Sequence, residues 1–164
     1  MSAYVTLLTP MTDQECLLAA LTDLGFDSSK VEVHATPTTL FGYEGEQQSV
    51  IANVIIRRRH LNGANNDIGF LASSTGFQAL IRGMDQTRFG SDWLAKLNAK
   101  YLSLAQIKQE RMDAAERRRV EEAHRQLVEA QRSAIHERAK KMGYMVKETR
   151  EGETLRLVLV RRTY

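Results

Sequence analysis

The sequence predicts an α+β domain in which strands form a largely antiparallel sheet with helices on one face, together with one long helix that projects from it. Three observations predict this class. β-prone segments occur before and after a long segment of helical composition. Turn dipeptides such as Asn62-Gly63 separate neighbouring strand segments. Residues 92–142 contain neither Gly nor Pro, so no breaker interrupts a run of about 50 residues. The predicted element order is β-α-β-β-β-α-β-β.

The first predicted elements are a strand and an amphipathic helix. Residues 3–9 alternate weakly in polarity and are followed by a proline, which favours a short strand closed by a turn. Thr12 and Glu15 have the spacing of a capping box, which predicts a helix over residues 12–24. Gly25 suits the left-handed conformation that ends such a helix. Its apolar face consists of Leu17, Ala20, Leu21 and Leu24.

Three strand segments follow before the long helical run. Residues 31–35 form a short β-prone segment. Residues 49–57 are apolar almost without interruption, which is typical of a strand covered on both faces. After the Asn62-Gly63 turn, residues 67–73 are expected to return as the second strand of a hairpin.

The chain is expected to finish with a second hairpin. Gly143 supplies a helix end, and residues 144–149 and 155–161 flank a Glu151-Gly152 turn. In residues 155–161 leucines alternate with valines, so both faces of the strand are apolar. We therefore expect this strand to lie in the interior of the sheet.

The long helical run divides into two parts. Residues 93–107 carry a broad apolar stripe with large side chains, which is expected to dock this part against the sheet. Residues 108–142 are a charged helical extension inserted between the two parts of the α+β domain, residues 1–107 and 143–164. A continuous helix over the whole run would be roughly 76 Å long, whereas a compact chain of this size has a radius of gyration of about 15 Å. The run must therefore either project towards a partner or fold back at an unmarked turn.

The charged extension has an apolar line of its own. Its members recur at heptad spacing and are mostly small, which permits close approach of a second helix as in a coiled coil. They are expected to contact a protein partner, and they are Val120, Ala123, Leu127, Ala130 and Ala134. A neighbouring line, spaced by sevens, consists of Val128, Ile135 and Met142.

Four segments of the chain resemble a known family. They are AYVTLLTPMTDQECLLAALTDLGF at the start, NDIGF at residues 66–70, WLAKLNAKY at residues 93–101, and GYMVKETREGETLRLVLVRR near the end. Together they resemble the family called hypothetical chloroplast reading frame thirty-five, found in cyanobacteria, plastids and other bacteria. The resemblance implies the family fold with a lengthened helix, since the family proteins lack most of residues 108–141. It implies no catalytic activity, and the neighbouring AAA-type ATPase of some bacterial relatives implies an accessory role.

No pattern in the sequence indicates an enzyme. Cys16 is the only cysteine, so it can form no internal disulfide, and its place beside Leu17 favours a small buried hydrophobe over a nucleophile. The four histidines have no metal-ligand spacing, and neither GxGxxG nor a Walker-type loop occurs. We therefore expect no metal and no cofactor, and an enzyme would need unrecognised polar groups around Asp67. The chain has no apparent leader or membrane span, so we expect a cytoplasmic protein.

Nucleic-acid binding is the alternative. The net charge of +3 and pI of about 9.1 permit it without favouring it strongly. If two basic strand ends adjoin on the sheet, they could contact phosphates, with Tyr144 or Tyr164 stacking on bases. The cationic residues of these ends are Arg57, Arg58, Arg59, Arg156, Arg161 and Arg162. Against this, Lys and Arg alternate with Asp and Glu along residues 108–141, as on a solvated helix.

The preferred hypothesis is a non-enzymatic interaction or accessory module. Its long helix is expected to mediate self-association or docking into a larger assembly, as a homo-oligomer or in a hetero-complex, with an AAA-type ATPase as the partner implied by the family resemblance.

Overall fold

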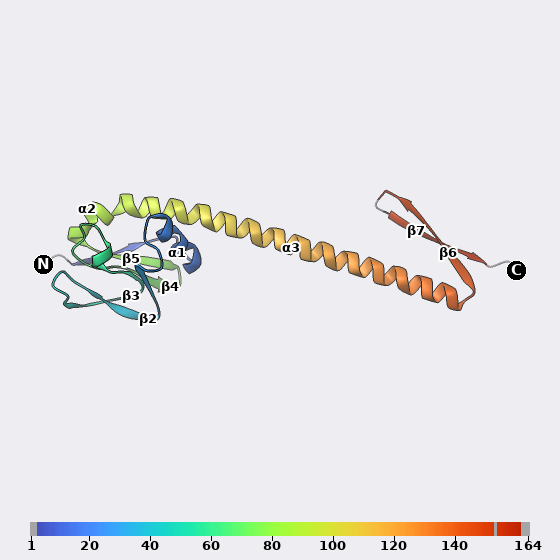
Figure 1. Cartoon of the computed structure of the whole chain (residues 1–164), viewed down its shortest axis with the longest axis horizontal. Helices are drawn as coiled ribbons and strands as arrows, with labels where there is room; N and C mark the ends of the chain where they lie inside the picture. Colours follow the sequence, from blue (N-terminus) through green and yellow to red (C-terminus); the bar gives the residue numbers. More distant parts are fainter. Residues whose placement is uncertain (1–2, 153, 162–164) are drawn as a thin grey trace. The chain divides into compact units, whose positions relative to one another are not determined.

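The structure is a computed structural model that describes residues 3–152 and 154–161 (Figure 1). The chain divides into two compact units, Met1–Glu110 (unit 1) and Arg111–Tyr164 (unit 2). Each unit is described by itself below.

Unit 1 contains a five-stranded antiparallel sheet with the strand order β1-β5-β4-β3-β2. The predicted α+β class is confirmed. Its strands are β1 (Tyr4–Leu8), β2 (Val31–Phe41), β3 (Gln47–Ile56), β4 (Ile68–Ser73) and β5 (Gly76–Arg82). The predicted return of residues 67–73 is confirmed, because β4 pairs antiparallel with β3 through Val54 and Phe70. The predicted order missed β5, which follows β4 after a tight turn and lies between β4 and β1.

The helical elements of unit 1 lie before β2, between β3 and β4, and after β5. They are α1 (Gln14–Asp23), the 3-10 helices η1 (Arg58–His60) and η2 (Gly83–Asp85), α2 (Gln86–Phe89) and the first part of α3 (Ser91–Lys141). The helix α3 is continuous over 51 residues, so the long run without Gly or Pro contains no turn. No helix in the described ranges is both long and apolar enough to cross a membrane.

The start of α1 differs from the predicted capping box. The cap is Asp13 rather than Thr12, because the Asp13 carboxylate accepts a hydrogen bond from the Cys16 N–H. The backbone N–H groups of Thr12 and Asp13 both donate to Tyr101 Oη at 3.0 Å. A side chain from α3 thus accepts from the Thr12 N–H, which the capping box would have paired with Glu15. The predicted end at Gly25 is confirmed by its φ of 94°.

The main core of unit 1 lies between one face of the sheet and the helices α1 and α3. Phe70 of β4 is fully buried, and its ring lies 6.4 Å from that of Trp93 on α3. Leu97 and Tyr101 extend the same side of α3 into the core. The predicted docking of residues 93–107 is therefore confirmed up to Ala105, whereas Ile107 is exposed.

A second, smaller core lies on the opposite face of the sheet. It contains Leu40, Ala52, Ile55 and Leu80. The strand β2 is longer than the predicted residues 31–35, and its register shifts between Val33 and Thr38, around Pro37. A proline is tolerated here because β2 is an edge strand. The Leu40 side chain lies against Gly69, where an added Cβ would be 3.0 Å from Leu40 Cδ2.

Unit 2 consists of residues 111–141 of α3 and the hairpin of β6 (Tyr144–Glu151) and β7 (Thr154–Arg161). Gly143 and Gly152 have φ of 77° and 63°, as the predicted helix end and turn require. The expectation that residues 155–161 lie inside the sheet is wrong, because β7 belongs to a two-stranded sheet with β6. The assignment of this hairpin to the same domain as residues 1–107 stays a prediction.

Candidate interaction surface

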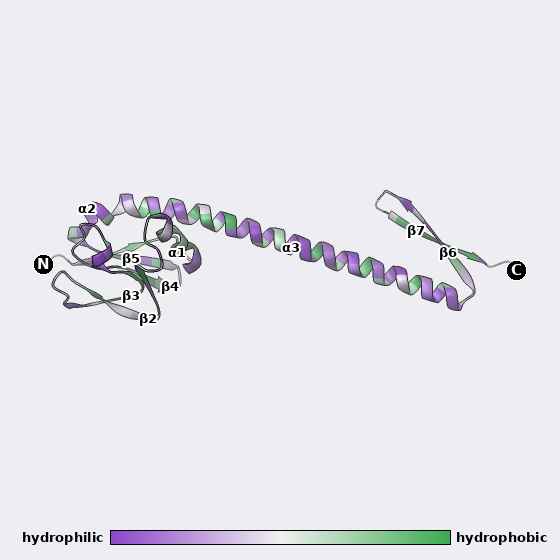
Figure 2. Cartoon of the chain, viewed as in Figure 1, coloured by the Kyte–Doolittle hydropathy of each residue, from purple (hydrophilic) through white to green (hydrophobic). Residues whose placement is uncertain are grey.

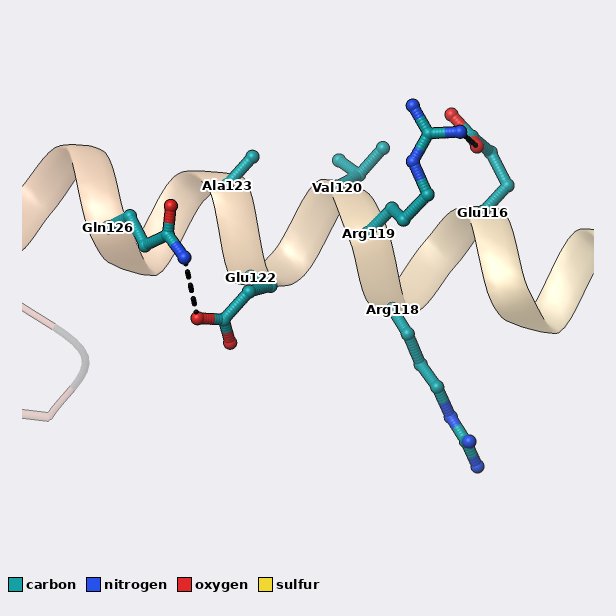
Figure 3. Close-up of a pocket in the computed structure, with 7 residues that line it drawn as sticks. All are labelled: Glu116, Arg118, Arg119, Val120, Glu122, Ala123 and Gln126. Atoms are coloured by element: carbon teal, nitrogen blue, oxygen red, sulfur yellow. Dashed lines mark hydrogen bonds and ion pairs between the residues drawn. The ribbon is translucent and has the colours of Figure 1, made fainter.

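The predicted contact residues form one exposed line on α3 within unit 2. This contact line consists of Val120, Ala123, Leu127, Ala130 and Ala134, and every member is exposed. Val120 keeps 60% of its surface and Leu127 keeps 56%. Spacings of three and four residues place these side chains on one side of the helix. In Figure 3, Val120 and Ala123 point to the same side, whereas Arg118 points the other way.

The hairpin covers a different side of the helix. Glu148 of β6 accepts hydrogen bonds from Arg132 Nη2 at 2.6 Å and Nε at 2.7 Å, and its other close partner is His136 Nε2. Ala139, one turn further, is only 3% exposed. Arg132 follows Leu127 by five residues, which rotates it by about 140° around the helix. The hairpin therefore leaves the contact line open.

This anchoring changes the acidity of Glu148. Hydrogen bonds from Arg132 and His136 lower the pKa of its carboxyl to about 2. Attraction to these neighbours favours the ionised form. The ion pair that joins hairpin and helix is thus kept at any pH well above that value.

Further apolar side chains lie between the contact line and the side of the helix that the hairpin covers. The flanking line of Val128, Ile135 and Met142 is also exposed. Figure 2 shows that hydrophobic positions recur along α3 between hydrophilic ones. Large apolar patches on a protein surface mark sites of interaction with proteins or membranes.

The contact line is bordered by uncharged side chains over most of its length. The bordering positions are His124, Gln126, Gln131 and Ser133. The charged residues of this stretch pair with one another at i,i+3, Glu122 with Arg125 and Glu129 with Arg132. These pairs lie on the sides away from Leu127, since each member is rotated by roughly 140–160° from it. A partner could therefore cover the contact line without burying an unpaired charge.

A hollow of about 440 Å³ overlaps the N-terminal end of the contact line (Figure 3). Its lining is Glu116, Arg118, Arg119, Val120, Glu122, Ala123 and Gln126. All of these residues belong to α3, so the hollow lies along a single helix and is not an enclosed cavity.

The hairpin exposes apolar side chains as well. Met145 pairs in register with Val160, and Val158 lies on the same face of the hairpin, which is opposite to the face of Glu148. All three side chains are exposed. A two-stranded hairpin is marginally stable on its own, so unit 2 relies on the contacts between β6 and α3.

The cationic residues of the alternative hypothesis are divided between the two units. Arg57 follows β3 in unit 1, and its side chain is only 14% exposed, because it pairs with Glu32 at 2.5 Å and with Asp67 at 2.8 Å. Arg58 donates to the Gly42 carbonyl, and Arg59 donates to His60 at 3.1 Å. These three guanidinium groups are therefore engaged within unit 1.

The other cationic residues belong to the hairpin. Arg156 lies 3.7 Å from Glu151, and Arg161 ends β7. Arg162, like Tyr164, lies outside the described residues. The two basic strand ends belong to different sheets, so they do not adjoin on one sheet as the alternative requires.

Asp67 is buried, with an exposure of 1%. It is the residue around which an unrecognised enzyme site was considered. Its Oδ2 accepts from the Phe41 N–H at 2.9 Å and from Arg57 Nη1, and its Oδ1 accepts from the Arg58 N–H at 2.8 Å. Tyr4 Oη donates to the Asp67 carbonyl, and burial together with the Asp67 charge raises the pKa of Tyr4. The carboxylate thus ties the ends of β2 and β3 together.

A second polar group lies beside Asp67, and its members Arg82 and Asp85 were not found from the sequence. Buried Asn66 donates from Nδ2 to Asp85 Oδ2 at 2.7 Å, and its Oδ1 accepts from Arg82 at 2.8 Å. A pocket of about 630 Å³ borders Asn66 and Arg82. The side-chain amide of Asn66 is hydrogen-bonded within the chain at both its nitrogen and its oxygen. No group of three or more His, Cys, Asp or Glu within the described ranges has the arrangement of a metal site.

Comparison with protein-family models, with curated proteins and with solved structures gave no match. The resemblance to the chloroplast reading-frame family therefore stays a hypothesis, and the surface of unit 2 has to be interpreted from its own chemistry.

Proposed function

We propose that this chain is a non-enzymatic interaction module that self-associates, or docks into a larger assembly, through residues 111–141 of α3. The observation that carries the proposal is the contact line, whose apolar side chains stay exposed although the hairpin packs on the same helix segment. Unit 1 has a core of its own to stabilise it. The contact line of unit 2 contributes little to the stability of the chain itself, so it suits a contact with another molecule.

The size of the contact line limits the affinity. Burying a Leu or Val side chain completely contributes about 1.5–3 kcal/mol. Val120 and Leu127 are already half-covered, so each contributes about half of that. A dissociation constant of about 1 µM requires about 8 kcal/mol. The contact line alone therefore supports weak association, and the flanking line must add to it if the complex is to be tight.

Light scattering over a series of concentrations tests self-association. We expect the mass of the wild-type chain to rise above the monomer mass with concentration. In the double variant Val120→Glu/Leu127→Glu the mass should stay monomeric, because two carboxylates would be desolvated in the interface. Arg118→Glu is the matched control: it changes the net charge equally but lies on the other side of the helix. If Arg118→Glu loses association equally, the effect is due to net charge, and the contact line is not the interface.

A site-specific crosslinker tests docking into a larger assembly. A photo-reactive amino acid at Leu127 should capture a partner in native extract, whereas the same group at exposed Arg125 should not, because two residues rotate it by about 160° from the contact line. If the chain is monomeric at all concentrations and both positions give the same products, the proposed function is wrong.

A further inference from the structure

The residues of unit 2 point to a particular partner for the contact line. We infer that a second copy of this chain binds there, with the two helices antiparallel and related by a two-fold axis near Leu127. This inference rests on the proposed function and adds the identity and the orientation of the partner.

Two pairs of apolar residues are arranged symmetrically about Leu127, whereas Ala123 and Ala130 lie four residues before and three residues after it. Val120 and Ala134 lie seven residues before and after it, and Met112 and Met142 lie fifteen residues before and after it. In an antiparallel pair centred on Leu127, the two helices run in opposite directions. A residue that lies a given number of positions before Leu127 in one copy is therefore level with the residue that lies the same number of positions after Leu127 in the other copy. Leu127 then meets Leu127, and Val120 meets the small Ala134, so a large side chain faces a small one. This alternation allows close helix packing.

The charges near the ends of the contact line decide the orientation. Glu116 and Arg138 lie eleven residues before and after Leu127, and Asp113 and Lys141 lie fourteen residues before and after it. An antiparallel pair therefore places Glu116 level with Arg138 of the second copy, and Asp113 level with Lys141. A parallel pair in register would place each of these residues level with its own copy, so acid would face acid and base would face base. Like charges at such positions disfavour pairing.

The intramolecular contacts of unit 2 are compatible with this pair. Glu116 pairs with Arg119 at 3.3 Å, but its side chain stays 60% exposed and can reach a second partner. The hairpin occupies the side of Arg132, His136 and Ala139, away from the contact line. The overlap of the two copies covers residues 113–141, which all belong to unit 2.

Disulfide formation between single-cysteine variants distinguishes the orientations. In the antiparallel pair the two copies of residue 120 are separated by about 21 Å, the rise of fourteen helical residues, whereas residue 120 of one copy lies opposite residue 134 of the other. A disulfide needs Cα atoms within about 7 Å. Under mild oxidation, a mixture of Val120→Cys and Ala134→Cys chains should form the mixed covalent dimer, and Val120→Cys alone should not crosslink. Leu127→Cys should crosslink with itself, and the wild-type chain, with only buried Cys16, is the control.

Charge reversal provides a second measurement that needs no cysteine. Glu116→Arg and Arg138→Glu should each weaken association severalfold in light scattering, and the double variant Glu116→Arg/Arg138→Glu should restore it. No restoration would overturn the inference.

Failure of the inference can be told apart from failure of the proposed function. If both Val120→Cys and Leu127→Cys crosslink with themselves, the helices are parallel; the inference is then overturned and the proposed function stands. If the chain stays monomeric, a second copy is not the partner and the inference is overturned. The photo-crosslinking experiment at Leu127 in native extract then tests the proposed function by itself.

Discussion

Unit 1 and unit 2 place their apolar side chains differently. Every buried hydrophobic residue in the described part of the chain except Ala139 lies in unit 1, and more than half of the exposed large hydrophobic residues lie in unit 2. Burial of apolar surface is the main stabilising contribution in folding. Unit 1 therefore has the means to fold by itself, whereas the apolar residues of unit 2 are available to other molecules.

The polar groups of the two units differ in the same way. In unit 1 a buried carboxylate, Asp67, is fully hydrogen-bonded and paired with Arg57. In unit 2 the pairs Glu116–Arg119 and Glu122–Arg125 are exposed, and such pairs contribute about 0.3–0.5 kcal/mol each. Substitutions in unit 1 should therefore change stability, and substitutions in unit 2 should mainly change association.

Phe70→Ala should have the largest effect. It removes a fully buried ring from the main core and should lower the free energy of unfolding by about 3–5 kcal/mol. The single Trp93 lies against Phe70, so its fluorescence in a urea titration reports the unfolding of unit 1. Leu127→Ala is the control in unit 2 and should shift the same transition by no more than about 0.5 kcal/mol. Equal shifts for the two variants would show that unit 2 is part of the same cooperative core.

Asp67→Asn should rank second. The amide keeps the size of the side chain but removes the charge that pairs with Arg57 and presents an N–H group to backbone donors. Removing one partner of a buried ion pair costs about 3–5 kcal/mol. Amide hydrogen exchange at Phe41 and Arg58, the two donors to the carboxylate, should accelerate more than elsewhere in unit 1.

Glu32→Gln is the matched control for Asp67. Glu32 also pairs with Arg57, but its side chain is partly exposed and water can replace the lost partner. We expect a clearly smaller loss of stability. A loss as large as that of Asp67→Asn would mean that the exposed pair, rather than the buried carboxylate, holds β2 and β3 together.

Gly69→Ala should destabilise unit 1 by a smaller amount. The new Cβ would lie 2.6 Å from Ala52 Cβ and 3.0 Å from Leu40 Cδ2, which is overpacking at about 1–3 kcal/mol. The double variant Gly69→Ala/Ala52→Gly removes the closer contact and should recover part of the loss measured by urea unfolding. Additive losses in the double variant would show that the two positions do not clash.

Local patterns in the sequence predicted the features that depend on residues close to one another in the chain. The end of α1 at Gly25, the pairing of β4 with β3 and the β6–β7 turn depend on residues a few positions apart, and each prediction was confirmed. The missed strand β5 follows a turn without an Asn-Gly or Asp-Gly signal. Its residues Phe77, Ala79 and Ile81 are buried on one side and Leu80 on the other, so its periodicity is weak.

The errors at particular residues have long-range causes. Thr12 does not cap α1, because the helix starts one residue later with Asp13 as its cap. Tyr101, almost ninety residues later, accepts from the Thr12 N–H that the capping box assigns to Glu15. The role of the Asp67 carboxylate could not be predicted, because one of its partners is the N–H of Phe41, twenty-six residues earlier. For the candidate site, helical periodicity predicted which residues share a side of α3. The periodicity could not show which side the hairpin covers, because that depends on the pairing of Glu148 with Arg132 and His136.

The smallest expected effect concerns the hairpin of unit 2 and depends on pH. Because the pKa of Glu148 is lowered to about 2 in the folded chain, its ionised form stabilises the contact of the hairpin with α3. This contribution is complete above the ordinary carboxyl pKa of about 4.3 and is lost as the pH falls through about 2. The protection factors of the β6 amides, which correct for the intrinsic pH dependence of exchange, should therefore fall over this range. In Glu148→Gln the protection factors should be lower already at pH 7, and their fall on acidification should be reduced.

Glu151→Gln is the control on the same hairpin, since it removes an exposed carboxylate whose partner, Arg156 at 3.7 Å, belongs to β7. Its exchange rates at pH 7 should match those of the wild-type chain, because an exposed pair at this distance contributes little. If the two variants behave alike, the contact of Glu148 with Arg132 and His136 does not hold the hairpin on the helix. The open side of α3 would then no longer be determined by that contact, and the contact line would lose its structural basis.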